Sequence, residues 1–166
     1  LNASQFRITP WYNDAVSDNY GEKLYMKYKG EIYDVIAGAS AAFYRGYAEY
    51  VCAAGDVRVR TTVFVPSGEQ CKTICIEAEN SAGEPADVSF CYGADLVLGQ
   101  TFHKDDRMIR IEEKDGVLYA RNPYHTEYGT GVVYLTGFKA DAVGISKLAF
   151  LCGEYEDARR MVSGEE

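Results

Sequence analysis

The sequence predicts an all-β protein, built as an antiparallel β-sandwich of about nine or ten short strands. From Phe43 onward, apolar and polar residues alternate with a period of two, as they do in half-buried strands. Glycine, proline, aspartate and asparagine separate the alternating segments at short intervals. No helical pattern intervenes between these segments, which argues for a sandwich and against a parallel α/β sheet.

The strands are expected in chain order at Glu22–Tyr28, Phe43–Cys52, Val57–Val65, Lys72–Glu79, Ala86–Leu98, Met108–Glu113, Val117–Arg121, Gly131–Phe138 and Lys147–Leu151. The third of these strands has the clearest alternation, with four valines on one face and arginine and threonine on the other. The four valines are Val57, Val59, Val63 and Val65. We expect this face to cover a core, and Pro66 to end the strand because proline cannot donate to the ladder.

Two local features are predicted from turn and capping chemistry. Asp115-Gly116 supplies the positive φ angles of a tight hairpin turn between the strands on either side. Tyr155–Met161 is expected to form a short C-terminal helix, since acidic residues precede the basic pair Arg159-Arg160 in the order that suits the helix dipole.

Length and charge limit the classes of function. The 166 residues suit one sandwich domain or a fragment of one. A net charge of −8 gives no general attraction to phosphate backbones, so nucleic acid is not an expected partner. No apolar run is long enough for a membrane-spanning helix, and the amino terminus does not resemble a signal peptide. We expect a cytoplasmic protein without direct membrane contact.

The cysteines suggest neither a disulfide framework nor a zinc site. Their number is odd and no CxxC spacing occurs among Cys52, Cys71, Cys75, Cys91 and Cys152. On one strand, Cys71 and Cys75 would lie about 13 Å apart, too far for a disulfide. We expect reduced thiols that pack as small buried apolar residues.

Intrinsic signals for catalysis are weak. Asp14, Asp18 and Glu22 have helical spacing, but the residues between them favour a loop, so turn bonds explain them better than paired catalytic carboxylates. His103 near two aspartates is a poor metal site without a second histidine. No catalytic residue, cofactor or metal is predicted. Trp11 with its neighbouring tyrosines is a possible saccharide platform, with ordinary packing as the alternative.

Several motifs occur in the order found in a known enzyme family. Thr9–Asp18, TPWYNDAVSD, followed by Gly21-Glu22, resembles the TPW-x-ND-x-VSD-xx-GE stretch of glycoside hydrolase family 94. Further matches follow at Gly46-Tyr47, Val63–Pro66, Glu79–Ser81, Ala120–Pro123 and Phe150–Gly153. The family includes cellobiose and chitobiose phosphorylases and the phosphorylase-like region of cyclic β-1,2-glucan synthases. Ala15, where the family usually has proline, and Tyr12, where it has a small residue, depart from the pattern.

The resemblance implies the amino-terminal sandwich of this family, a supersandwich of the galactose mutarotase-like kind. In the family, a helical linker and an (α/α)₆ barrel follow it, and the barrel carries the catalytic aspartate. The chain is therefore expected to be a non-catalytic domain of an enzyme, a glycoside phosphorylase or a membrane-associated glucan synthase. A freestanding lectin-like carbohydrate-binding sandwich and a purely structural interaction domain are the alternatives.

The resemblance also implies two loops that face a saccharide or the barrel. The first loop contains Trp11, Asn13, Asp14, Ser17 and Asp18, and the second contains Asn122, Tyr124 and His125. The expected partners are the helical barrel of the parent chain and an oligo- or polysaccharide. Strands that precede the TPW stretch in the family are missing, so we expect an incomplete sandwich whose open edges self-associate.

Overall fold

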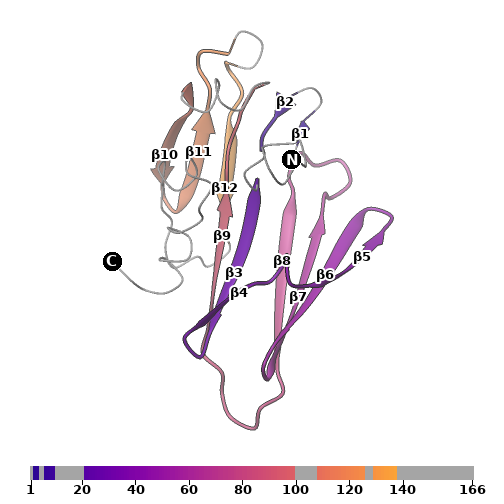
Figure 1. Cartoon of the computed structure of the whole chain (residues 1–166). Coiled ribbons are helices and arrows are strands. Elements are labelled where there is room, and N and C mark those ends of the chain that lie inside the picture. The colour runs from indigo at the N-terminus through magenta and orange to yellow at the C-terminus, as the bar shows by residue number, and fades with distance from the viewer. Residues whose placement is uncertain (1, 4–5, 10–20, 100–107, 126–128, 138–166) are drawn as a thin grey trace. The chain divides into compact units, whose positions relative to one another are not determined.

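The computed structural model describes residues 2–3, 6–9, 21–99, 108–125 and 129–137. Within these ranges, all secondary-structure elements of two or more residues are β-strands (Figure 1). The chain forms two compact units, the first from residues 1–22 and 94–154 and the second from residues 23–93 and 155–166. The predicted all-β fold with antiparallel sheets is confirmed. The predicted strand at Lys147–Leu151 and the predicted helix at Tyr155–Met161 lie outside the described residues.

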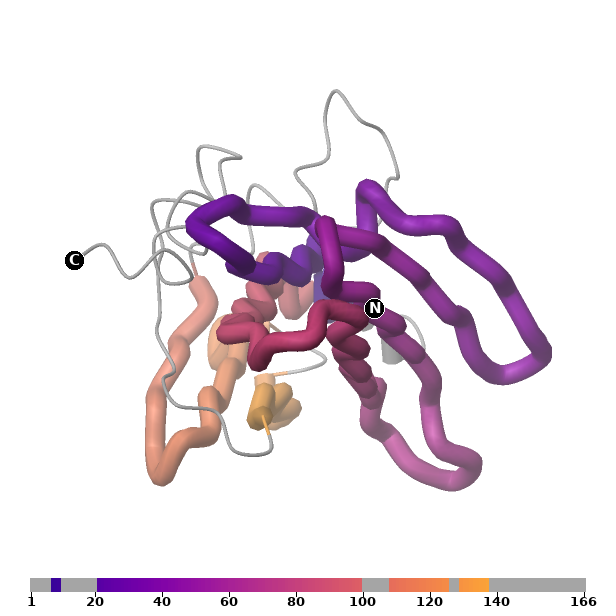
Figure 2. Tube along the Cα trace, turned by 90° about the horizontal axis from the view of Figure 1, so that it is seen from below, coloured from indigo at the N-terminus to yellow at the C-terminus, as the bar shows by residue number. Residues whose placement is uncertain are grey.

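The larger sheet of the second unit is an antiparallel meander. Its strands are β5 (Ser40–Tyr44), β6 (Tyr47–Ala54), β7 (Val57–Phe64) and β8 (Thr73–Asn80). Their order in space is their order in sequence, β5-β6-β7-β8. Figure 2 follows the same meander from below. The two outer strands of the sheet are β5 and β8.

The smaller sheet of the second unit has the order β4-β3-β9. Its strands are β3 (Glu22–Tyr28), β4 (Glu31–Asp34) and β9 (Val88–Ala94). The predicted bounds of β3 are confirmed, but β4 was not predicted. Its hairpin turn is made by Lys29 and Gly30, which both have positive φ, +51° and +82°, as a two-residue turn of this kind requires.

The core of the second unit lies between its two sheets. One cluster of buried side chains joins Leu24, Met26, Tyr28, Val35, Cys52, Ala54, Val57 and Val59. The first four come from β3 and the turn after β4, and the last four come from β6 and β7. Because both sheets contribute to one cluster, they face each other as the layers of a β-sandwich do. Burying each large apolar side chain stabilises the fold by about 1.5–3 kcal/mol.

The predicted valine face of β7 is only half correct. Val57 and Val59 are buried, but Val63 is partly exposed and Val65 is 56% exposed. Val65 lies beyond the strand, which ends at Phe64. Thr61 is the next buried residue on this face, so the core covers the beginning of β7 and not its end.

Two further predicted strands differ clearly from the observed ones. The segment Phe43–Cys52 is not one strand, because the chain reverses at Arg45-Gly46, where Gly46 has a φ of +98°. Tyr44 and Tyr47 become cross-strand partners, with ring centroids 4.6 Å apart. The strand predicted to reach Leu98 ends at Ala94, and Leu98 itself has a φ of +45°.

The first unit contains two small sheets. The first pairs β1 (Asn2–Ala3) with β2 (Phe6–Arg7), and the second has the order β10-β11-β12. The strands of the second are β10 (Arg110–Lys114), β11 (Val117–Arg121) and β12 (Val133–Thr136), so β12 is shorter than predicted. Buried Leu98, Ile109 and Ala120 form the core of this unit.

The predicted hairpin at Asp115-Gly116 is confirmed. Both residues have positive φ, +54° and +74°, and Lys114 pairs with Val117 across the turn. The backbone N–H of Gly116 also donates a 2.8 Å hydrogen bond to Glu113 Oε1, which closes the turn further.

The cysteines differ from the prediction in their burial. The four in the described residues are free thiols, and Cys52 is buried while Cys91 is half-buried. Cys71 and Cys75 are exposed, so their predicted burial was wrong. Cys75 lies on β8, one of the two outer strands of its sheet, and Cys71 precedes that strand. Cys152 lies outside the described residues.

Candidate functional site

The structure describes the second predicted loop but not the first. Trp11, Asn13, Asp14, Ser17 and Asp18 all lie outside the described residues. The second loop, residues 122–125, follows β11 in the first unit.

Asn122 anchors this loop from inside the protein. It comes directly after β11 and is only 1% exposed. Its Nδ2 donates to the backbone carbonyl of Leu98 at 3.2 Å, and its Oδ1 accepts from the backbone N–H of Tyr124 at 3.3 Å. Its own carbonyl accepts from the N–H of His125 at 3.2 Å. Asn122 therefore shapes the loop and does not face a ligand directly.

Tyr124 is the member of the loop that projects outward. It is 62% exposed, and the guanidinium carbon of Arg110 lies 5.6 Å from the centre of its ring. An amino group of the same arginine is 3.5 Å from the tyrosine hydroxyl. The arginine thus holds an exposed aromatic ring in place by a cation–π contact. His125 is half-buried beside it.

The loop comes close to the chain that follows it. A Cβ atom added to Gly129 would lie 2.7 Å from the backbone oxygen of His125, which is closer than real Cβ atoms approach. Glycine therefore permits the close approach of residue 129 to the loop.

One face of the β10-β11-β12 sheet is covered with exposed aromatic and charged side chains. We call this surface the tyrosine face and define it by Arg110, Glu112, Tyr119, Arg121 and Tyr134. At the turn end of the same face lie Lys114, Val117 and Thr136. The other face of the same strands supplies Ala120 to the core, with Ile111 and Val133 packed against it. Alternation along the strands thus places the core residues of the sheet on one face and leaves the other face open.

The register places these side chains in two rows. Glu112, Tyr119 and Tyr134 are paired across the three strands, and Arg110 is paired with Arg121 in the next row of the same face. Tyr119 is 39% exposed and Tyr134 is 61% exposed. Arg121 and Glu112 form an ion pair with a distance of 3.4 Å.

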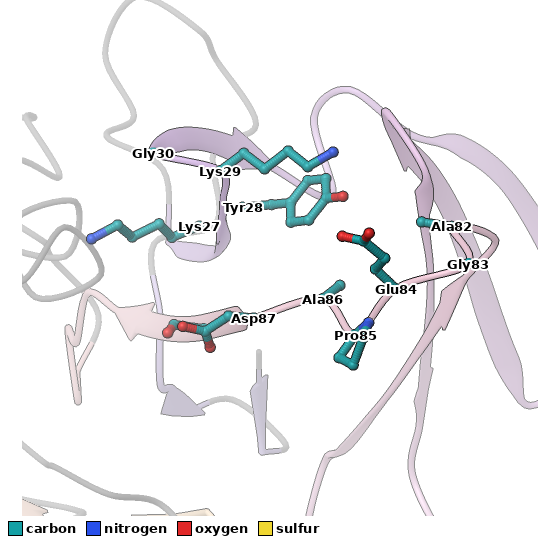
Figure 3. Close-up of a pocket in the computed structure, with 11 residues that line it drawn as sticks. Lys27, Tyr28, Lys29, Gly30, Ala82, Gly83, Glu84, Pro85, Ala86 and Asp87 are labelled. Carbon is teal, nitrogen blue, oxygen red and sulfur yellow. The ribbon is translucent and has the colours of Figure 1, made fainter.

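The second unit contains a separate open groove of about 570 Å³ (Figure 3). Its walls are the end of β3 with its turn, residues 27–30, and the connection from β8 to β9 with the first part of β9, including residues 82–87. This connection is well braced. Asn80 Nδ2 donates to the carbonyl of Glu84 at 2.7 Å, and the backbone N–H of Ser81 donates to the carbonyl of Asp56 at 2.9 Å.

The charges of this groove do not converge on one point. In Figure 3 the amino groups of Lys27 and Lys29 extend to opposite sides of Tyr28. Lys29 forms an ion pair with Asp56 at 3.2 Å. Hydrogen bonding to Tyr28, and then to Asp56, raises the pKa of Lys29. Because the two lysine amino groups extend in opposite directions, the groove is a weaker candidate for a ligand site than the tyrosine face.

The described residues contain no group of three histidine, cysteine or acidic side chains placed to hold a metal ion. Over the same part of the chain, no helix has the length and hydropathy needed to cross a bilayer.

The family model of the glycosyl hydrolase 94 supersandwich domain matches residues 1–160. The chain belongs to this family. This match confirms the resemblance found in the sequence motifs. The supersandwich domain is a non-catalytic domain of glycosyl hydrolase 94 enzymes. A comparison with curated proteins finds no match.

Within this supersandwich domain, sequence reasoning found Tyr124 but missed the rest of the open surface. Tyr119, Tyr134 and Arg110 were not singled out. Alternation along β11 already indicated that Tyr119 lies on the face of the strand opposite to that of the core residue Ala120. Their proximity depends on the pairing of β11 with β12. The excess of tyrosine, fourteen residues, was the one compositional signal that pointed toward such a surface.

Proposed function

We propose that this supersandwich domain contacts the catalytic helical barrel of a glycoside phosphorylase or cyclic β-1,2-glucan synthase and shapes the rim of its active site. The observation that supports this role is the construction of the loop 122–125. Buried Asn122 fixes the loop to the core, while Tyr124 is left exposed and is held by Arg110. A fixed loop with an exposed aromatic tip suits contact with a saccharide or with another domain.

The first predicted loop is proposed to form a second part of the same rim. Its members are Trp11, Asn13, Asp14, Ser17 and Asp18. This assignment rests on the family motif that these residues match. It predicts that Asp14→Ala or Asp18→Ala in the full-length protein changes the kinetics or the stability; unchanged values of both would remove the loop from the rim.

The test of the main proposal is phosphorolysis by the full-length protein. Phosphate and a panel of β-linked disaccharides are supplied, and release of sugar 1-phosphate is followed. We expect Tyr124→Ala to lower kcat/KM by about tenfold, because an aromatic contact to the bound saccharide is lost. Tyr44→Ala removes a similarly exposed tyrosine from the second unit and should leave the kinetics unchanged.

Two results would contradict the proposal. One is that neither phosphorolysis nor β-glucan synthesis is detected in the full-length protein. The other is that Tyr124→Ala and Tyr44→Ala have the same kinetics as the wild type.

A freestanding carbohydrate-binding sandwich is the second candidate function. The exposed tyrosine face favours it, since aromatic rings beside polar groups suit saccharide binding without catalysis. The open reading frame distinguishes the two candidates, because only the first requires a barrel of several hundred helical residues. Saccharide binding without phosphorolysis or glucan synthesis would support the second candidate.

Contacts between subunits are proposed to use the free edge of β8. Within the described residues, β8 pairs with β7 alone, and most of its eight residues are exposed. An unpaired edge of this length offers backbone donors and acceptors to another copy. Light scattering should detect a dimer that Ile76→Lys weakens, since a charge on an edge strand opposes pairing. Monomer alone over a wide range of concentration would contradict this contact.

A further inference from the structure

We propose that the tyrosine face is a glycan-binding surface that holds a neutral β-linked gluco-oligosaccharide outside the catalytic centre. The identity of the glycan rests on the proposed function, while the existence of the surface rests on the described residues. The face therefore extends saccharide contact beyond the loop 122–125, along the open side of the β10-β11-β12 sheet.

The dimensions of the face suit a short stretch of sugar rings. Glu112, Tyr119 and Tyr134 form one row across three neighbouring strands. Since neighbouring strands lie about 4.8 Å apart, this row spans about 10 Å. Arg110 and Arg121 form the next row, about 7 Å along the strands. Tyr124, in contact with Arg110, continues the surface toward the loop.

The two tyrosine rings are held by a packed sheet. Tyr119 and Tyr134 are direct cross-strand partners. The strands beneath them are fixed by Ala120, Ile111 and Val133 on the other face. Tyrosine has only two side-chain torsions, so little conformational entropy is lost when a ligand covers its ring. The surface is therefore ordered before a glycan arrives, which favours binding.

The polar groups around the rings match the chemistry of hydroxyl groups. The guanidinium of Arg121 and the carboxylate of Glu112 lie 3.4 Å apart and are both largely exposed, so they offer donors and acceptors side by side. The rings supply apolar area for the C–H face of a sugar, and the ion pair supplies hydrogen bonds for its hydroxyls. A saccharide satisfies both parts of the surface.

The rings and hydrogen-bonding groups of the face, and not its net charge, favour a neutral sugar, because Arg110, Arg121 and Lys114 carry three positive charges against the one negative charge of Glu112. Arg121 is paired with Glu112, and Arg110 is engaged with the ring and hydroxyl of Tyr124. Lys114, at the turn end of the same face, adds one further positive charge. An apolar protein segment would remove water from these charged groups without replacing its hydrogen bonds, which costs free energy.

The experiment is isothermal titration of the full-length protein with linear β-1,2- and β-1,4-gluco-oligosaccharides of six or more units. It is repeated at low and high salt, with α-1,4-linked maltohexaose as a comparison. The variants are Tyr119→Ala, Tyr134→Ala, their double variant, and Tyr134→Phe, which keeps the ring. Tyr44→Ala is the matched control on the second unit. Circular dichroism verifies that each variant is folded.

We expect the wild type to bind at least one β-linked series, with affinity that changes less than about twofold with salt, because a neutral ligand is not screened. Each tyrosine-to-alanine change should weaken binding by about tenfold. Tyr134→Phe and Tyr44→Ala should bind as the wild type does. Kinetic constants for a disaccharide should be unchanged in the double variant, which separates this surface from the rim around Tyr124.

Four results would overturn the inference. They are absence of binding to every β-linked series, equal binding by the wild type and the double variant, tighter binding of maltohexaose, and an affinity that falls steeply with salt. If phosphorolysis and glucan synthesis are absent but binding depends on both tyrosines, the glycan surface stands and the proposed enzymatic context fails.

Discussion

The side-chain amide of Asn122 donates a 3.2 Å hydrogen bond to the backbone carbonyl of Leu98, a buried residue with a φ of +45°. A left-handed backbone costs an ordinary L-residue about 1–2 kcal/mol, so this part of the chain is held in place by its surroundings. The same asparagine accepts the N–H of Tyr124. One buried amide thus joins a strained segment to the loop that presents the exposed tyrosine.

The first prediction concerns this anchor. Asn122→Ala removes both hydrogen bonds and leaves the carbonyl of Leu98 and the N–H of Tyr124 without that partner. We expect the free energy of unfolding in urea to fall by about 1–3 kcal/mol. Tyr124→Ala, two residues away and exposed, should change it by less than about 0.5 kcal/mol. Equal stability of wild type and Asn122→Ala would show that the amide is not a structural anchor.

The second prediction concerns acid stability and Asp34. Its Oδ1 accepts from the N–H groups of Ile36 and Ala37, and its Oδ2 accepts from Lys23 at 2.8 Å. Burial raises the pKa of Asp34, but the hydrogen bond from Ala37, those from Lys23 and Ile36, and the charge of Lys23 together hold that pKa below its usual value of 3.8.

Because the folded pKa is lowered, this stabilisation is complete above the unfolded pKa and is lost as the pH falls through the folded pKa. Asp34→Asn keeps an acceptor for the turn but removes the titration. We expect the wild type to lose more stability than Asp34→Asn between pH 5 and strongly acidic pH, measured by denaturant unfolding at each pH. Asp87→Asn, an exposed aspartate, should follow the wild type; identical pH profiles for all three would contradict the prediction.

Local chemistry predicted the turns and strands that depend on a few adjacent residues. Asp115-Gly116 formed its hairpin because both residues accept positive φ. The turn at Arg45-Gly46 was missed because aromatic residues continue on both sides of it, so apolar content alone does not show where the chain reverses. Burial of the end of β7 was wrongly expected, because alternation gives the face of a strand but not how far the opposite sheet extends.

The candidate surface was predictable only in part for a similar reason. A sequence motif identified the loop 122–125, but the inward role of Asn122 depends on Leu98, which is distant in the chain. Tyr119 and Tyr134 become neighbours through the register of β11 and β12. That register depends on the connection between the two strands. The alternation of apolar and polar residues in either strand does not determine the length or shape of this connection.

The third prediction concerns thiol reactivity. Burial, and then the charge of Asp34, raises the pKa of Cys52, and burial raises the pKa of Cys91, so both stay protonated near neutral pH. Cys71 and Cys75 are exposed. Since the thiolate is the reactive form, iodoacetamide should modify Cys71 and Cys75 before Cys52 and Cys91 in the native protein.

Peptide mass spectrometry over a time course assigns each modification to its cysteine. In denaturant Cys52, Cys71, Cys75 and Cys91 should react at similar rates, which is the control for differences between local sequences. Early modification of Cys52 in the native protein would mean that the core of the second unit opens more readily than its packing indicates.

The fourth prediction concerns Thr61, which is completely buried on the core face of β7. Its Oγ1 has no hydrogen-bond partner within the described part of the chain. Burial of an unsatisfied hydroxyl is unfavourable, and valine has nearly the same shape without the polar atom. We therefore expect Thr61→Val to raise the free energy of unfolding by about 1 kcal/mol and the Tm by about 2–4 °C.

Thr62→Val separates this effect from the general preference of strands for valine. Thr62 is the next residue of the same strand and lies on its opposite face, so its replacement changes strand propensity without relieving the buried hydroxyl. Stability is compared by thermal unfolding of the three proteins. A gain in Thr61→Val that exceeds the gain in Thr62→Val supports the assignment, whereas a loss of stability in Thr61→Val would show that the hydroxyl is satisfied by a buried water that valine displaces.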